Sequence, residues 1–248
     1  MRTDVSIPMP DGDAARAFVF TPDSGPGPWP AVLFYMDGPG IRPALFDMGE
    51  RMAAAGYFVL LPDMFWRLGP YEPFNLKALF GSPDGLKEFR AKVMSSTDAV
   101  RAMADTFVFL NWIAAQPQAE AGKLGVTGYC MGGSFAMHAA GTYPDRFGAV
   151  AAFHPAMLAT DKEDSPHRLA PKIQAEVLVA GGDEDAGFDE AQKDRLAAAL
   201  RDAGVKAQVS IWKGYRHGWV PADMPVHNPE GAERHWRELI ALFDRHLR

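Results

Sequence analysis

Residues 123–143 read KLGVTGYCMGGSFAMHAAGTY, and they carry the clearest indication of the architecture. The stretch begins as a short apolar run, passes through a glycine-rich turn around Cys130, and continues as a helix-forming sequence. A buried strand that leads through a sharp turn directly into a helix is typical of α/β proteins with a parallel sheet. We therefore predict an α/β fold in which Cys130 lies at the end of a strand.

The same alternation of strand-like and helix-like patterns extends in both directions along the chain. Short apolar runs, most of them continuous, recur at residues 15–22, 31–36, 57–62, 148–153, 175–181 and 207–212. Continuous runs are expected for strands that are buried on both faces of a parallel sheet. Helical periodicity falls between them, at residues 43–55, 97–115, 189–203 and from 228 to the end. The pattern predicts one domain over residues 1–248, with a mainly parallel, doubly wound sheet flanked by helices.

The composition excludes several classes of protein. The 25 basic and 31 acidic side chains give a net charge of −6 without a basic patch, so we expect no nucleic-acid partner. A single cysteine cannot form an internal disulfide or build a cysteine-rich metal site, and no histidine spacing suits a metal, so no metal or cofactor is expected. The sequence contains neither an apolar stretch of membrane-spanning length nor a visible signal peptide, which predicts a cytoplasmic protein without membrane contact. Monomer and homodimer are both open.

Residues 64–96 interrupt the regular alternation of strands and helices. Aromatic residues are frequent there among prolines and glycines, including Trp66, Tyr71, Phe74, Phe80 and Phe89. The segment follows the predicted carboxyl end of a strand, which is where ligands bind in open α/β sheets. Two interpretations are open: an aromatic-rich excursion or lid over the active site, or a surface loop with a short packing helix.

Cys130 is the candidate nucleophile. Its surroundings, GYCMGG at residues 128–133, match the G-x-S-x-G nucleophile elbow with Cys in place of Ser. Glycines keep side chains out of a crowded turn, so the nucleophile can take a strained backbone and project outward. A helix N-terminus favours the thiolate, and the amide of Met131 is expected to point to a developing oxyanion. A buried structural cysteine is the alternative interpretation.

A nucleophile of this kind needs an acid and a base, which follow it in that order along the chain. Asp185 comes after the apolar run 175–181, and Asp183 is the second candidate because one residue of loop geometry decides which carboxylate faces inward. His217 lies in a glycine-containing loop between the last predicted strand and the last predicted helix. It has the most suitable position for the base among the seven histidines.

These residues together resemble the dienelactone hydrolase family, a cysteine-nucleophile branch of the α/β-hydrolases, over nearly the whole chain. The motif GYCMGG is the most specific marker, because most α/β-hydrolases carry serine at the position of Cys130. The resemblance implies an α/β-hydrolase fold with a triad of Cys130, Asp185 and His217. It further implies that Asp37 pairs with the resting nucleophile and influences its protonation, and that the amide of Gly38 is the second oxyanion donor.

Two departures from the family pattern concern the substrate. Dienelactone hydrolases proper carry Glu at the position of Asp37, and an Arg shortly after the catalytic histidine, where this chain reads HGWVP. Three other arginines are candidates for the contact with a substrate carboxylate: Arg42, Arg67 and Arg90. Tyr129 and Trp219 are candidates for the wall of an apolar acyl or ring pocket, although Trp219 equally suits packing.

The predicted activity is hydrolysis of a small-molecule carboxylic ester or lactone through a thioester acyl-enzyme, as in carboxymethylenebutenolidases. One alternative is a non-catalytic protein that uses the α/β-hydrolase fold to bind a small molecule. A redox protein based on Cys130 is a further alternative, which the absence of a second, resolving cysteine weakens.

Overall fold

The computed structural model describes residues 1–248, apart from the side chain of Pro83. Its centre is an eight-stranded sheet with the order β1-β2-β4-β3-β5-β6-β7-β8. The strands are β1 (Arg2–Pro8), β2 (Ala14–Phe20), β3 (Ala31–Tyr35), β4 (Phe58–Pro62), β5 (Leu124–Tyr129), β6 (Phe147–Phe153), β7 (Glu176–Glu184) and β8 (Ala207–Arg216). Strands β3 to β8 run parallel, while β2 pairs antiparallel with both β1 and β4.

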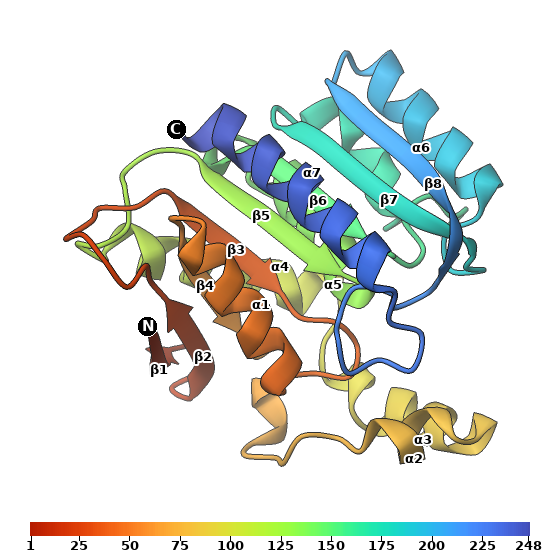
Figure 1. The fold of residues 1–248 in the computed structure, drawn as a ribbon, viewed down its shortest axis with the longest axis horizontal. Coiled ribbons are helices and arrows are strands. Elements are labelled where there is room, and N and C mark those ends of the chain that lie inside the picture. The colour runs from red at the N-terminus through yellow and green to blue at the C-terminus, as the bar shows by residue number, and fades with distance from the viewer.

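Helices cover both faces of this sheet. They are α1 (Pro43–Ala54), α2 (Leu76–Phe80), α3 (Pro83–Lys92), α4 (Ala99–Ala114), α5 (Met131–Thr142), α6 (Glu190–Asp202) and α7 (Pro229–Leu247). Helices α1 and α7 lie across one face and α4 and α5 across the other (Figure 1). This is the predicted doubly wound α/β-hydrolase architecture, and it places the carboxyl ends of the parallel strands at one edge of the sheet.

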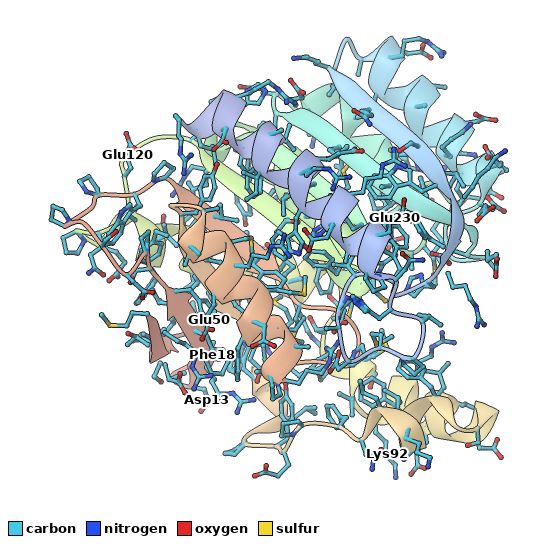
Figure 2. All side chains as sticks on the ribbon, viewed as in Figure 1. Asp13, Phe18, Glu50, Lys92, Glu120 and Glu230 are labelled. Carbon is cyan, nitrogen blue, oxygen red and sulfur yellow. The ribbon has the colours of Figure 1, made fainter. Side chains whose placement is uncertain are left out.

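The strands in the middle of the sheet are buried on both sides. Every residue of β3, β4 and β5 is buried, which explains why these segments are continuous apolar runs in the sequence. Figure 2 shows the opposite tendency at the surface, where Asp13, Glu50, Lys92, Glu120 and Glu230 are exposed while Phe18 packs inward. The core of the fold is thus continuous across both layers of helices.

The outermost strand, β1, lies outside the predicted set of strands. It forms the edge of the sheet, and most of its residues, RTDVSIP, are exposed and polar. A strand that packs only a few side chains against the core leaves no apolar run in the sequence. Its partner β2 carries most of the apolar residues, and β1 adds backbone pairing and a single buried side chain, Ile7.

The segment 64–96 contains η1 (Trp66–Leu68), α2, α3 and η2 (Met94–Ser96), and α2 and α3 project away from the sheet (Figure 1). Its aromatic rings pack on one another: Tyr71 stacks on Phe74 at 5.1 Å, and Phe89 meets the edges of both Phe74 and Phe65. The Tyr71 hydroxyl donates to Asp63 Oδ1 at 2.7 Å, just after β4. Four of the aromatic residues therefore form a cluster that anchors the segment, while Phe80 is exposed, and a lid movement stays a prediction.

None of the helices in the described part of the chain has both the length and the apolar composition that a membrane span requires.

Candidate active site

Cys130 lies in the sharp turn between β5 and α5. Its backbone has φ 55° and ψ −116°, a conformation that residues with a side chain rarely adopt. The Cys130 N–H donates to the Phe153 carbonyl at 3.2 Å, and the Gly133 N–H donates to the Cys130 carbonyl at 3.1 Å. The thiol therefore stands at the carboxyl end of the sheet and at the N-terminus of α5, where the helix dipole favours an anion.

Two glycines make this turn sterically possible. A Cβ on Gly128 would lie 1.9 Å from the Gly132 carbonyl oxygen, and a Cβ on Gly132 would lie 2.4 Å from the Met36 carbonyl oxygen. Both distances are far below van der Waals contact, so no side chain fits at either position. The second contact also shows that the first turn of α5 rests against the loop after β3, which brings that loop next to Cys130.

Asp185 and His217 lie together at the ends of β7 and β8. His217 Nδ1 is 2.7 Å from Asp185 Oδ2, and the second carboxylate oxygen, Oδ1, accepts the Gly187 N–H at 2.8 Å. The Asp185 side chain is 2% exposed and that of His217 is 33% exposed. The carboxylate is thus held on both oxygens, and it orients an imidazole that still reaches the surface.

Asp183, the second candidate for the acid, faces another way. Its Oδ1 accepts the backbone N–H of Gly214 at 2.7 Å and that of Tyr215 at 3.3 Å. It therefore fastens β8 to β7 rather than contacting His217. Of the two carboxylates that the sequence left open, the structure brings only Asp185 to the histidine.

The electrostatic surroundings of His217 favour the charged ring. Burial lowers the pKa of His217, but the negative charges of Cys130 and Asp185 and their hydrogen bonds to the ring outweigh burial and raise this pKa to about 10. Cys130 therefore lies close enough to His217 to affect its charge, and the surroundings of His217 favour the protonated ring at neutral pH.

Two backbone amides flank the thiol in the positions expected for an oxyanion hole. Met131 is the first residue of α5, so its N–H has no carbonyl acceptor within the helix. Gly38 borders Cys130 from the other side, because a Cβ on Gly38 would lie 3.9 Å from Cys130 Sγ. The same Cβ would lie 3.7 Å from the terminal methyl of Met94, so the end of the 64–96 segment also reaches the site.

Arg42 and Asp37 form an ion pair with each other close to Cys130. Arg42 Nη1 and Nη2 donate to the two oxygens of Asp37 at 2.5 and 2.8 Å, and Arg42 Nε donates to Asp223 Oδ2 at 2.7 Å. The side chains of Asp37 and Arg42 are each 2% exposed. This corrects the expectations that Arg42 contacts a substrate carboxylate and that Asp37 pairs with the thiol, because a buried bidentate ion pair occupies both groups.

Tyr129 and Trp219 are core residues. Tyr129 is fully buried, and its hydroxyl lies 2.7 Å from His235 Nε2. Trp219 is also fully buried and stacks on Tyr215 with ring centroids 5.4 Å apart. Neither ring reaches a surface that a substrate can touch, which corrects the expectation that they line a pocket. Arg67, another candidate for an anion contact, is bound by both oxygens of Asp105 at 2.7 Å.

His154 is a buried histidine directly behind His217. The two ring centroids are 5.4 Å apart at an interplanar angle of 70°, and a similar contact of 5.2 Å joins His154 to Trp219. Neither ring nitrogen of His154 has a hydrogen-bond partner among the described residues. Burial and the charge of His217 lower the pKa of His154 well below its usual value, so its ring is neutral. The sequence signal for this residue is its position directly after the strand run 148–153.

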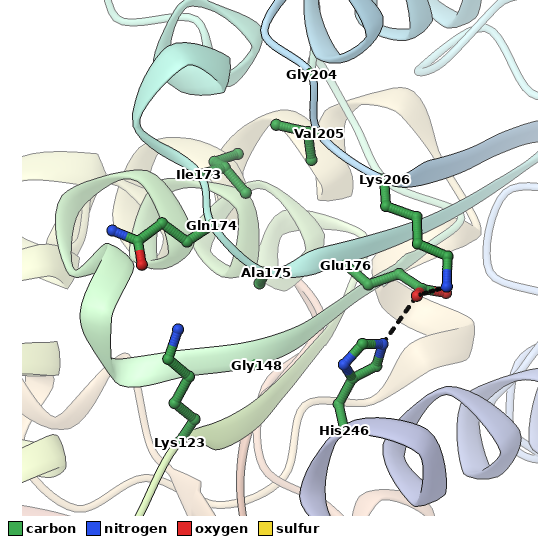
Figure 3. Close-up of a pocket in the computed structure, with 10 residues that line it drawn as sticks. All are labelled: Lys123, Gly148, Ile173, Gln174, Ala175, Glu176, Gly204, Val205, Lys206 and His246. Atoms are coloured by element: carbon green, nitrogen blue, oxygen red, sulfur yellow. Dashed lines mark hydrogen bonds and ion pairs between the residues drawn. The ribbon is translucent and has the colours of Figure 1, made fainter.

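A hollow of about 540 Å³ lies at the opposite ends of the strands from Cys130, where β5 to β8 begin (Figure 3). Glu176 in this hollow binds Lys206 at 2.5 Å and His246 at 2.8 Å. Lys123, which also lines it, precedes β5, whereas Cys130 follows β5. The hollow is therefore separated from the thiol by the length of a strand. No group of three or more His, Cys, Asp or Glu side chains among the described residues is arranged to hold a metal ion.

Comparison with known proteins agrees with this geometry. Residues 15–247 match the sequence profile of the Dienelactone hydrolase family. Two proteins named "Putative carboxymethylenebutenolidase", from Methylorubrum extorquens and Escherichia coli K12, are each 26% identical to this chain. The matches cover 97% and 96% of this chain, and 79% and 84% of those proteins.

Solved structures show the same fold. A Klebsiella pneumoniae protein reported as a "Putative Dienelactone Hydrolase" superposes with a TM-score of 0.85 at 23% identity, over 99% of both chains. An acylaminoacyl peptidase from Pyrococcus horikoshii has a TM-score of 0.73 at 17% identity, and its match covers all of this chain and 42% of the peptidase. The superpositions establish an α/β-hydrolase fold, and the profile match over most of the sequence establishes the family. The chain is a hydrolase and belongs to the dienelactone hydrolase family.

Proposed function

We propose that the protein hydrolyses carboxylic esters or lactones, with Cys130 as nucleophile, His217 as base and Asp185 as the residue that orients His217. The observation that carries the proposal is the 2.7 Å contact between His217 Nδ1 and Asp185 Oδ2 next to Cys130, whose backbone is strained at φ 55°. A buried acid, a histidine that reaches the surface and a nucleophile at a helix N-terminus form the arrangement that acyl transfer needs.

In the proposed mechanism, the Cys130 thiolate attacks the carbonyl carbon and forms a carbon–sulfur bond. The N–H groups of Gly38 and Met131 stabilise the oxyanion of the tetrahedral intermediate. His217 gives its proton to the departing alkoxide as the carbon–oxygen bond breaks, which leaves a thioester. His217 then takes a proton from water, the resulting hydroxide attacks the thioester, and the acid leaves with regeneration of the thiolate.

The charges around the thiol favour an ester without a carboxylate. All the cationic donors of Arg42 are bound to Asp37, Gly40 and Asp223. The methionine side chain of Met94 borders Gly38. The substrate class that fits this site best is therefore a neutral ester or lactone with a small apolar acyl group.

A trapped acyl-enzyme tests the proposed function. We expect wild-type protein, quenched in acid during turnover of p-nitrophenyl butyrate, to carry a butyryl group on the peptide that contains Cys130. The measurement is mass spectrometry of the digested protein, and iodoacetamide treatment before the substrate is the control that should remove the adduct. Turnover without any adduct on Cys130 would contradict the thioester mechanism, and saturable binding without turnover would indicate a binding protein.

The raised pKa of His217 predicts an unusual alkaline limit of activity. Because this pKa lies at about 10, the ring keeps its proton through neutral pH, and kcat/KM is expected to decline only as the pH rises through about 10. The same shift affects the free energy of unfolding. The raised pKa of His217 contributes its full stabilisation below pH ~6.5, where the histidine of the unfolded chain is also protonated. This contribution is lost as the pH rises toward the folded-state pKa of about 10. Initial rates between pH 6 and 11 check the first statement, and a decline centred near ~6.5, the ordinary histidine value, would contradict it.

A further inference from the structure

A chain of charges, of which Asp37 and Arg42 are buried, joins the loop of Gly38 to the loop of His217. Arg42 lies at its centre, between Asp37 and Asp223. We propose that Arg42, through Asp223, is a positioning residue that sets the separation between the oxyanion donor Gly38 and the base His217. This inference rests on the acyl-transfer function proposed above.

Every N–H of the Arg42 guanidinium is engaged. Nη1 donates to Asp37 Oδ1 at 2.5 Å and to the Gly40 carbonyl at 3.0 Å, and Nη2 donates to Asp37 Oδ2 at 2.8 Å and Asp223 Oδ1 at 3.2 Å. Nε donates to Asp223 Oδ2 at 2.7 Å. A guanidinium has five such donors in a rigid plane. Because both of its edges are occupied, Arg42 fixes two carboxylates in a defined relative orientation, which the freely rotating ammonium of a lysine does less rigidly.

The two carboxylates belong to the two loops that form the candidate site. Asp37 directly precedes Gly38, between β3 and α1. Asp223 follows His217 in the loop between β8 and α7. The contact between Arg42 and Asp223 spans 181 positions of sequence. The sheet places the two loops near each other, and the ion pair joins them directly through side chains.

Burial of Arg42 and Asp37 distinguishes this link from an ordinary surface salt bridge, although Asp223 is partly exposed. Arg42 and Asp37 are each 2% exposed and Asp223 is 33% exposed, so water competes little for the inner pair. Arg51 of α1 and Glu233 of α7 form a bidentate pair at 2.6 Å between the two helices that follow these loops. That pair is 46% and 53% exposed, so it contributes little. It is the matched control for the buried link.

The link is expected to affect acyl transfer more than the reactivity of the thiol. His217 has a second support in Asp185, so the pair of His217 and Cys130 persists when Asp223 is removed. Trp219 also anchors the His217 loop in the core, whereas the hydrogen bonds between this loop and the Gly38 loop in the described residues run from Arg42 to Asp223. The substrate carbonyl must fit between His217 and Gly38, and a displacement of about 1 Å can reduce the rate by about 10²-fold.

The test compares two reactions of the Asp223→Ala variant. This variant leaves the buried pair of Arg42 and Asp37 intact, so we expect it to fold and to melt near the wild-type temperature. Its kcat for p-nitrophenyl butyrate is expected to fall by about 10- to 100-fold. Alkylation of Cys130 by iodoacetamide, which uses no oxyanion donor, is expected to proceed at the wild-type rate. Asp223→Glu, which keeps the carboxylate, is expected to restore most of kcat.

Each outcome decides the inference. A wild-type kcat in Asp223→Ala overturns it, and so does a parallel loss of hydrolysis and alkylation, because that result would place the effect on the thiolate. The Arg51→Met control is expected to keep full activity. An equal loss of kcat in this variant would mean that Arg42 and Asp223 affect activity only through the general packing of the fold. Failure of the function itself is seen separately, as hydrolysis that survives the loss of Cys130.

Discussion

The Cys130→Ala variant is expected to hydrolyse short p-nitrophenyl esters more slowly than wild-type protein by a factor on the order of 10⁵–10⁶. The reason is that the thioester pathway requires a bond to sulfur, while the remaining site offers only binding and the amides of Gly38 and Met131. Initial rates with p-nitrophenyl acetate and with an enol lactone measure the effect. The loss should appear as a lower kcat and not as a higher KM.

Two controls make this result interpretable. The substitution keeps a Cβ at a position that already tolerates φ 55°, so the thermal midpoint is expected to stay close to that of wild type. Wild-type protein that has been alkylated with iodoacetamide should lose its activity to the same extent. Substantial turnover by Cys130→Ala would mean that another residue is the nucleophile, or that His217 activates water directly.

The second large effect is expected for Asp185→Asn. An amide at this position cannot stabilise the imidazolium, and it favours the wrong tautomer of His217, so kcat should fall by about 10⁴-fold. The variant also removes one of the two charges that raise the pKa of His217. The alkaline limit of the pH–rate profile should therefore move to lower pH, which a purely structural defect would not produce.

Asp183→Asn is the matched control for this variant. Its side-chain oxygen can still accept the N–H groups of Gly214 and Tyr215, so the end of β8 keeps its support. We expect nearly wild-type kcat and an unchanged pH profile. If Asp183→Asn and Asp185→Asn were equally impaired, Asp185 would not be the residue that orients His217.

The parts of this structure that depend on local sequence were predictable. The elbow at Cys130 has its signature in one contiguous stretch, because the steric demands on Gly128 and Gly132 fall within a few residues of the thiol. The parallel strands were also predictable, since burial on both faces requires continuous apolar runs. Strand β1 was not predictable, because an exposed edge strand joins the sheet mainly through backbone hydrogen bonds, which leave no pattern in the sequence.

The parts that depend on distant contacts were not predictable. Nothing in the sequence around Arg42 indicates Asp223, which the fold brings to it from the far end of the chain. Without that partner, an arginine near the thiol looks free to bind an anion. Tyr129 likewise follows a strand that ends at the site, yet its side chain points to His235 in the core. The direction of a side chain at the end of a strand depends on helices that follow much later in the sequence and pack against that strand.

The three non-glycine residues with positive φ are Cys130 at 55°, His154 at 36° and Met157 at 57°. Cys130 is the proposed nucleophile, His154 contacts His217, and Met157 donates its N–H to the carbonyl of Gly187 beside Asp185. Such conformations cost of order 1–3 kcal/mol each. The protein's conformational strain is thus concentrated where its chemistry takes place. Engineering for heat resistance could relax Met157 with glycine, but Cys130 cannot be relaxed in the same way, because glycine there would remove the thiol. The elbow therefore limits how stable an active form of this protein can become.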